Sequence, residues 1–395
     1  MPGRTDGSKR AIVVGARITA LDRARSFITL LVLIHHAVIN YTYFGSGDKM
    51  RWLGFDLVVL FNDSFFMACM FLISGLFVHD SLQRSGPASY VGRRAWRLGV
   101  PFLISIFVLM PIAYYPTFLR YHLPGTTDFS FMHFWWHTIS VGPWPSGPAW
   151  FLWVLLALDM FAAALWSIAP RSLRMFGLLI FSLRDRPVTA FVAFLLLSVF
   201  SYLPLRLMVG DASWLEPGGY PLPIQTSRIL LYGGYFFTGV GIGAVSLRHG
   251  VLAENGEFAK RWPVWLGVAG LGYAAILLLV YLHHHGIADF SSPPLFWQTG
   301  YGLAFALFSA AMTVALLTTS LHLATSRIGL LDAMQPSAYG IYLTHYVFIV
   351  WLQYAVYDYS WPALVKAAVV LIGTLVLSWG LTATLRKIAV VARMI

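Results

Sequence analysis

The sequence contains few charged residues for its length. Only 11% of its 395 residues are Asp, Glu, Lys or Arg, against about a quarter in soluble domains. Hydrophobic residues make up 58% of the chain and aromatic residues 16%. This balance excludes an ordinary soluble domain and predicts a polytopic membrane protein.

Cysteine is almost absent, and acidic residues are sparse. Cys69 is the only cysteine, so an intramolecular disulfide is excluded. Acidic residues number 16 against 27 Lys and Arg, which gives a net charge of +11. Of those 27 residues, 21 fall in the N-terminal segment and in alternate loops. This alternation is the positive-inside pattern, so it predicts both termini in the cytoplasm and no nucleic-acid partner.

Long apolar runs recur along the chain, each near the roughly 20 residues that span a bilayer. We divide the chain into a cytoplasmic segment 1–26, one membrane-embedded domain 27–385 and a cytoplasmic tail 386–395. The first run is too long for a signal-peptide core and lacks a cleavage site, so we expect it to be retained. The runs predict an all-α bundle of about ten transmembrane helices, at 27–44, 54–79, 98–115, 149–169, 188–209, 229–247, 263–282, 295–323, 337–357 and 362–385.

Polar residues share one face of the first predicted helix. Residues 3, 4, 7 or 11 apart lie on the same side of an α-helix. Ionisable groups at bilayer depth are costly and usually face a cavity or a partner. We therefore predict a catalytic role for His36, although a hydrogen bond to a neighbouring helix is the alternative. The stripe comprises Arg25, Thr29, His36, Asn40 and Tyr43, and we assign Asn40 and Tyr43 to the substrate pocket.

Arg25 precedes His36 by eleven residues, which is a rise of about 16 Å along a helix. If Arg25 marks the cytoplasmic interface, His36 lies near the middle of a hydrocarbon core about 30 Å thick. This spacing suits a long donor with an anionic head at the cytosolic face. His35 points about 100° away from the stripe, so we expect it to pack against a neighbouring helix.

Two further sets of charged residues are candidates for the site. "YVGRRAWRLGVP" contains Arg93, Arg94 and Arg97 before the third predicted helix. Because Arg94 and Arg97 lie about one turn apart, they could bind one phosphate, although membrane orientation alone would also explain the cluster. Asp63 lies within the second apolar run. A carboxylate there could orient His36, or it could pair with an arginine.

Other motifs have plainer explanations. The adjacent histidines 283–285 have no nearby carboxylate or cysteine, so we expect no metal site there. Gly239, Gly241 and Gly243 do not follow a predicted strand, so they indicate close helix packing rather than a phosphate loop. Tryptophans 135, 136, 144 and 150 favour an interfacial aromatic belt, with sugar stacking as the alternative.

In five motifs the sequence resembles the acyltransferase 3 family of integral membrane O-acyltransferases. "LDRARSFITLLVLIHHAV" is similar to the family's opening motif and pairs Arg25 with His36. "FLISGLFV" resembles its Ser-Gly signature at Ser74, and "RRAWRLGVP" its arginine motif. "GPAWFLWVLLALDMF", with Trp150, is similar to its Trp-x-Leu segment, and "SAYGIYLTHYVF" to its Tyr-Leu-x-His segment at Tyr342 and His345.

The resemblance implies acyl transfer from cytoplasmic acyl-coenzyme A to a hydroxyl of an envelope glycan, polysaccharide or glycolipid. It implies His36 as general base or acyl relay, with Arg25, Arg93, Arg94 and Arg97 at the donor. Ser74, Trp150, Tyr342 and His345 would belong to the substrate pocket. Acyl-coenzyme A would be a co-substrate, with no tightly bound cofactor, and the chain would lie in a bacterial inner membrane.

The segment "WFLWVLLALD" begins with Trp-Phe-Leu and has no carboxylate before Asp159. In its Trp-Phe-Leu form it resembles the branch with periplasmic glucan succinyltransferases, which leaves acetyl and succinyl as alternative acyl groups. A separate periplasmic partner could complete the transfer, and the oligomeric state is open. The alternative function is a glycan or lipid-linked precursor transporter, although the two halves of the chain show no internal repeat.

Overall fold

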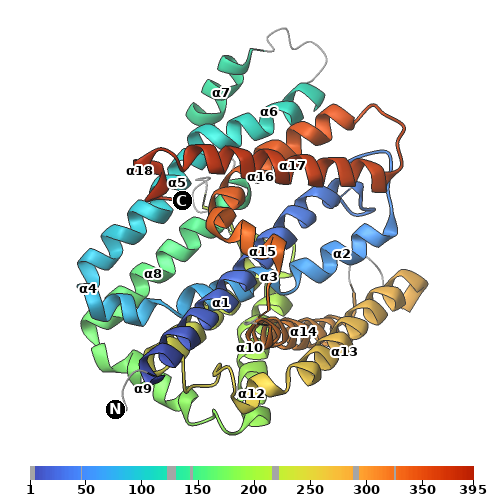
Figure 1. Cartoon of the computed structure of the whole chain (residues 1–395). Helices are drawn as coiled ribbons and strands as arrows, with labels where there is room; N and C mark the ends of the chain where they lie inside the picture. The colour runs from blue at the N-terminus through green and yellow to red at the C-terminus, as the bar shows by residue number, and fades with distance from the viewer. Residues whose placement is uncertain are drawn as a thin grey trace.

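The computed structural model describes residues 5–45, 47–121, 130–142, 146–215, 222–287, 293–323 and 326–395. These residues are almost entirely helical (Figure 1). The helices are α1 (Thr5–Val38), α2 (Leu53–Asp63), α3 (Phe66–Gly75), α4 (Val78–Arg94), α5 (Val100–Ile104), α6 (Met110–Tyr121), α7 (Phe131–Ser140), α8 (Trp150–Ile168), α9 (Pro170–Phe181), α10 (Pro187–Val209), α11 (Ile229–Val245), α12 (Glu257–Lys260), α13 (Trp262–Leu282), α14 (Leu295–His322), α15 (Gly329–Met334), α16 (Ala338–Val356), α17 (Ala363–Leu385) and α18 (Ala389–Ala392).

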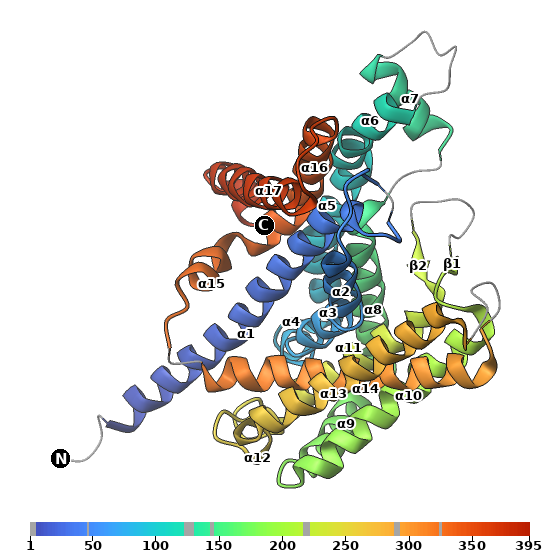
Figure 2. The same cartoon turned by 90° about the vertical axis from the view of Figure 1, so that its right-hand side faces the viewer.

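Shorter elements join these helices. The antiparallel strands β1 (Trp214–Leu215) and β2 (Ile224–Gln225) form a small hairpin beside the bundle (Figure 2). The 3-10 turns are η1 (Ile39–Tyr41), η4 (Gly147–Ala149), η6 (Thr226–Arg228) and η8 (Gln335–Ser337), and the π-helical turns are η2 (Ala95–Gly99), η3 (Ser105–Leu109) and η7 (His283–Ile287).

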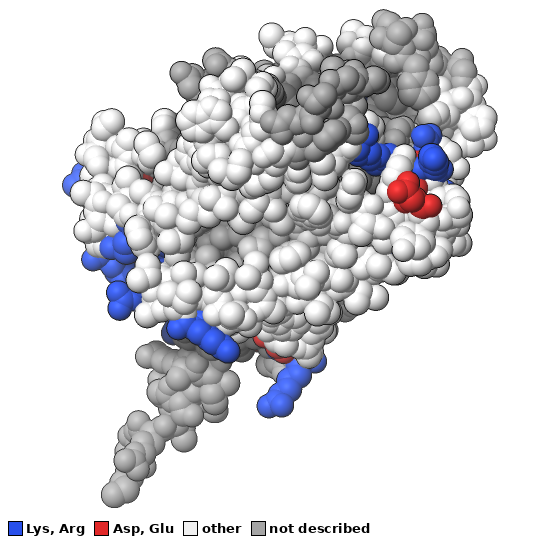
Figure 3. Space-filling view, turned by 90° about the horizontal axis from the view of Figure 1, so that it is seen from above, with Lys and Arg blue, Asp and Glu red and all other residues white. Residues whose placement is uncertain are grey.

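The predicted all-α membrane fold is confirmed. Among the described residues, nine helical segments are long and apolar enough to cross a membrane. They match nine of the ten predicted ranges. The tenth range, 337–357, is occupied by α16, which is not one of the nine. Lys and Arg side chains gather towards opposite ends of the face in Figure 3, with a broad uncharged surface between them. The number of spans and the side of the termini stay predictions.

Two predicted segments differ in their local structure. The range 54–79 was expected to be one helix, but the structure breaks it between α2 and α3 at Ser64 and Phe65. The break releases the Asp63 carbonyl oxygen, which accepts a hydrogen bond from Arg228 at 2.9 Å. A side chain inserted into the backbone ladder is a known cause of helix breaks. Residues 80–97, which lie between the second and third predicted helices, are mostly helical in α4, which is kinked at Gly86 with φ of 72°.

Close packing of α3 against α11 forms part of the buried core, and it confirms the role predicted for the glycines of α11. A Cβ atom at Gly239 would overlap the carbonyl oxygen of Leu72, and one at Gly243 would overlap that of Leu76. Small residues let two membrane helices approach backbone to backbone. Gly241 faces the other way, towards α9.

Helix α1 lies between the α16–α17 pair and the α13–α14 pair (Figures 1 and 2). In the middle of α1, Arg23 donates hydrogen bonds to the Asp332 carboxylate and to the Leu323 carbonyl oxygen. The bond from Arg23 lowers the pKa of Asp332 below its ordinary value. Near its C-terminal end α1 contacts α16 through Gln353. The half of α1 that carries the histidines is therefore fixed on both sides.

We expect Gly239→Ala to destabilise the protein, because the added methyl group overlaps backbone that cannot move aside. Overpacking of this kind costs about 1–3 kcal/mol. Gly267→Ala in α13 is the matched control, since nothing lies within 4 Å of its Cβ position. The thermal unfolding midpoint in detergent should fall for Gly239→Ala alone. Equal midpoints for the two variants would contradict the packing account.

Candidate functional site

A cavity of about 450 Å³ is lined by four of the predicted site residues: His36, Asp63, Trp150 and Tyr342. They come from α1, α2, α8 and α16, which are far apart in the sequence. Trp214 and Gln225 of the β1–β2 hairpin also line the cavity. The fold thus gathers the predicted residues beneath a small hairpin.

The His36 ring is held between α1 and α16. Its centroid lies 5.4 Å from that of His345 and 5.3 Å from that of Tyr346. The His36 carbonyl oxygen accepts a hydrogen bond from the Gln353 amide at 3.0 Å. Within the described residues the His36 imidazole has no hydrogen-bond partner, and it lines the cavity. Its position therefore leaves a ring nitrogen available to a substrate.

His345 is completely buried beside His36. Its Nδ1 lies 2.5 Å from the Tyr342 carbonyl oxygen. Because a carbonyl only accepts, Nδ1 carries the proton, and neutral His345 presents a lone pair on Nε2. That Nε2 is buried and has no partner among the described residues.

Tyr342 and Trp150 are placed by contacts with their own surroundings. The Tyr342 hydroxyl donates a hydrogen bond to the Pro148 carbonyl oxygen, just before α8. Trp150 stacks on Tyr232 of α11, with 5.5 Å between ring centroids. One aromatic wall of the cavity is therefore built from α8, α11 and α16.

His35 has a larger part in the cavity than the sequence indicated. Its ring packs at 5.4 Å from that of Phe66, which agrees with the predicted packing role. It also lines the same cavity as His36, and its Nδ1 has no partner among the described residues. The helical angle of about 100° between adjacent residues does not separate the two histidines here, because the cavity wraps around α1.

Asp63 pairs with Arg228. The Arg228 Nη2 donates to the Asp63 carboxylate at 2.5 Å, while Nη1 bonds the Asp63 carbonyl oxygen. The Arg228 side chain is 6% exposed and that of Asp63 is 45% exposed, facing the cavity. Two partners were predicted for Asp63, an arginine and His36. The structure pairs Asp63 with an arginine, and the described chain shows no bond from Asp63 to the His36 ring.

Arg228 is a site residue that the sequence reasoning missed. It was counted only as one of six basic residues outside the cytoplasmic clusters. Its guanidinium also lies 5.0 Å from the Phe305 ring, and it is buried at the start of α11. The available signal was Asp63 itself, since a carboxylate within an apolar run needs an opposite charge.

The predicted arginines gather near Arg25, about three turns before His36 on α1. The charges of Arg94 and Arg97 lie close enough to act on Arg25. Arg25 contacts Asp22 at 3.2 Å, and its guanidinium lies 4.9 Å from the Phe77 ring. The guanidinium groups repel one another, and a bound anion would offset this repulsion by attracting each of them. The group is therefore a candidate phosphate site.

Three of these arginines have different surroundings. Arg94 is bound by the buried Asp159 carboxylate at 2.5 Å, which also accepts from Tyr90. Arg97 is exposed in the π-helical turn η2 and has no ion pair in the described part of the chain. Arg93 is exposed and bonds Ser85. Arg97, which has no carboxylate partner among the described residues, and Arg25, whose contact with Asp22 is longer, are therefore better placed to bind a ligand than Arg94.

Helices α1 and α16 link the arginines to the imidazoles. Tyr339 on α16 donates a hydrogen bond to the Arg97 carbonyl oxygen at 2.6 Å. Tyr342 lies about one turn further along α16 and lines the same cavity as His36, and His345, about one turn beyond it, packs beside the His36 ring. The two helices thus run side by side from the arginine group to the cavity. None of the predicted arginines lines the cavity itself.

The predicted polar stripe ends at His36. Asn40 bonds Gln353 at 2.6 Å and lines a different cavity, while Tyr43 is 57% exposed. The cause is the 3-10 turn η1, which changes the angle between successive side chains after Val38. Ser74 lies in α3 outside the cavity lined by His36. These three residues are therefore not placed beside the imidazole.

The remaining candidates lie elsewhere. Trp135 bonds the Phe107 carbonyl oxygen at 2.8 Å, Trp136 is 64% exposed, and Trp144 is outside the described residues. Stretches covered by the structure contain no group of three His, Cys, Asp or Glu side chains that could hold a metal ion. His285 stacks on Tyr281 at 4.0 Å.

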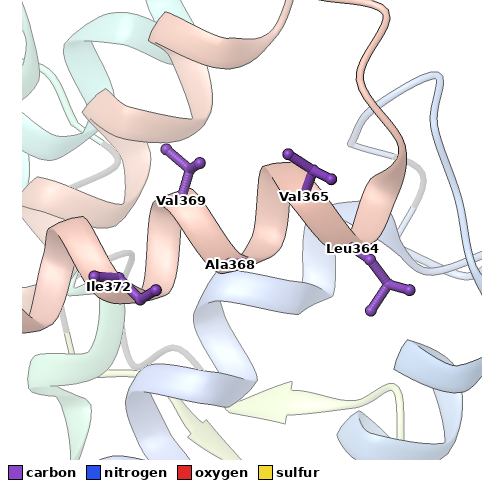
Figure 4. Close-up of a pocket in the computed structure, with 5 residues that line it drawn as sticks. All are labelled: Leu364, Val365, Ala368, Val369 and Ile372. Carbon is purple, nitrogen blue, oxygen red and sulfur yellow. The ribbon is translucent and has the colours of Figure 1, made fainter.

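A second hollow of about 650 Å³ lies on α17 and is lined only by aliphatic side chains. Figure 4 shows Val365 and Val369 on one side of the helix and Leu364 on the other. Without a polar group, this surface offers lipid contact rather than chemistry.

The chain matches the model of the acyltransferase 3 family, described as an acyltransferase domain, over residues 18–383. It therefore belongs to this family, and it is an integral membrane acyltransferase. No curated protein matches the chain. The matched region includes residues 18–38 of α1, the arginine group and α16.

We expect Asp63→Asn to destabilise the fold, because it leaves the buried Arg228 charge without its partner. Breaking a buried ion pair lowers the free energy of unfolding by about 3–5 kcal/mol. Because Asp63 is partly exposed to the cavity, we expect a loss of about 3 kcal/mol for this pair. The double variant Asp63→Leu with Arg228→Met should regain stability. Thermal unfolding in detergent measures both, and a double variant that merely adds a second loss would count against the pairing.

Proposed function

We propose that the protein transfers an acyl group, acetyl or succinyl, from cytoplasmic acyl-coenzyme A to a hydroxyl of an envelope glycan, polysaccharide or glycolipid in the bacterial inner membrane. The observation that carries this proposal is the His36 imidazole, which lines a cavity and lies on the same helix as Arg25. Family membership favours this chemistry over the transporter alternative.

The donor would bind with its phosphates at Arg25 and Arg97. Arg94 would act chiefly by fixing η2 through Asp159, and Arg93 would add charge at the rim. The pantetheine arm would then run along α1 and α16 and bring the thioester towards His36. The rise of about 16 Å between Arg25 and His36 sets the length that this arm must cover.

His36 can serve the reaction in two ways. As a general base it accepts the proton of the acceptor hydroxyl, whose oxygen attacks the thioester carbonyl. The carbon–sulfur bond breaks, and the thiolate takes the proton from the imidazolium. As a relay, the imidazole itself attacks the thioester, and the hydroxyl then attacks the acyl-imidazole. Both routes yield one ester and one free thiol.

Neighbouring groups would support either route. His345 packs beside the ring and keeps it from turning away. Arg228, held by Asp63, is placed at the cavity wall, where its charge would stabilise an oxyanion. Trp150 and Tyr342 would present ring surface to the acceptor. This scheme does not require a periplasmic partner.

Loss of the imidazole gives the first test. We expect His36→Ala to lower transfer by about 10²–10⁴-fold, since a positioned base contributes that much. His79→Ala is the matched control, because His79 is also buried but packs against Trp166 in α8. Transfer from radiolabelled acyl-coenzyme A by purified protein is the readout. A fully active His36→Ala protein, or equal losses in both variants, would refute the assignment.

The arginines give a second, separate test. Arg25→Gln and Arg97→Gln should each raise the KM for acyl-coenzyme A about tenfold or more, because each removes a charge-assisted hydrogen bond to phosphate. Arg184→Gln is the control, since Arg184 is exposed, lies after α9, and within the described chain pairs with Asp185 and packs over the Phe181 ring. An unchanged donor KM in the first two variants would contradict the proposed phosphate site.

A further inference from the structure

A second polar cavity, of about 260 Å³, lies against the C-terminal end of α16. The turn η1 lies between it and the His36 cavity, because Ile39 lines the first cavity and the adjacent Asn40 lines the second. Its wall includes the side chains of Asp48, Arg120, Gln353 and Tyr357. Such a mixture of amide, charged and aromatic groups is typical of a binding site for a small polar ligand.

Tyr41 shows that the cavity has unused hydrogen-bonding capacity. The residue is 0% exposed and lines this cavity. Its hydroxyl is buried and has no hydrogen-bond partner among the residues described. Buried polar atoms are nearly always satisfied, so an orphan hydroxyl in a cavity wall points to a missing partner.

The charge of the cavity is also unbalanced. Among the described residues its one acidic wall residue is Asp48, and Lys366 engages both carboxylate oxygens of Asp48 with Nζ at 3.0 and 2.9 Å. Arg120 lies 3.4 Å from the Tyr357 ring centroid and has no ion pair within the described chain. The guanidinium is therefore held in place by an aromatic face and is available to an anion.

We propose that this cavity binds one sugar ring that carries an anionic group, as an acidic unit of the acceptor glycan. Arg120 would bind the anion, the Asn40 and Gln353 amides and the Tyr41 hydroxyl would meet ring hydroxyls, and Tyr354, which is 40% exposed, would cover the ring face. The volume of about 260 Å³ admits a single ring. The identification of the ligand as acceptor rests on the proposed function, whereas binding itself does not.

Gln353 connects this cavity with the catalytic helix. Its Oε1 accepts from Asn40 at 2.6 Å, while its Nε2 donates to the carbonyl oxygens of His36 and Ala37 at 3.0 and 3.3 Å. A sugar bound here would lie directly against the residues that fix the end of α1. The next unit of the same glycan could then reach the His36 cavity on the other side of η1.

Cysteine protection tests the site directly. Thr117 is exposed and lines the cavity, and the native Cys69 is fully buried, so Thr117→Cys introduces one reactive thiol. We expect glucuronate to slow labelling of this thiol by a membrane-impermeant maleimide, and glucose and acetate to be far weaker. Glucose 6-phosphate shows whether phosphate replaces carboxylate. Adding Arg120→Gln should raise the half-protecting glucuronate concentration about tenfold or more.

Ser360→Cys is the matched control, because Ser360 is exposed in the neighbouring α16–α17 connection but does not line the cavity. Its labelling should not respond to glucuronate. Equal protection of both thiols, equal protection by acetate, or protection that survives Arg120→Gln would each overturn the proposal. Protection in a His36→Ala background should be unchanged, so failure of the catalytic assignment and failure of this site give different results.

Discussion

The hydrogen bonds from the Gln353 amide to the end of α1 determine how the two central helices are aligned. The last carbonyl groups of a helix have no partner within it, and inside a membrane no bulk water replaces that partner. Gln353 fills this need at His36 and Ala37. A shift of α16 by one turn would leave both carbonyls unsatisfied, so the alignment of α16 with α1 is fixed.

That alignment gives the two ends of the helix pair different chemistry. At one end Tyr339 reaches the Arg97 backbone, close to the charge of Arg25. At the other end His345 and Tyr346 enclose the His36 ring. A long anionic donor fits such a pair, because its head and its reactive carbon need different surroundings. The Asp63–Arg228 pair lines the cavity at the break between α2 and α3. A continuous helix through this apolar range would not contain that break.

The sequence predicts the parts of this arrangement that depend on local spacing. Apolar runs mark the helices, and the spacing of eleven positions from Arg25 to His36 places both on one face of α1. The glycines of α11 indicate close packing, which the structure confirms against α3. Features that depend on long-range contacts were out of reach. Arg228 is 165 residues from Asp63, and Asp159 is 65 residues from Arg94, so no local pattern pairs them. Asn40 was misplaced because a 3-10 turn follows Val38.

The most direct test of the account is a structure of the full-length protein with a non-hydrolysable acyl-coenzyme A analogue in a lipid nanodisc. The account predicts phosphate oxygens within hydrogen-bond distance of Arg25 and Arg97, and the thioester carbon mimic beside a ring nitrogen of His36. A nucleotide bound away from these arginines, or an acyl end that stops short of the imidazole, would contradict it.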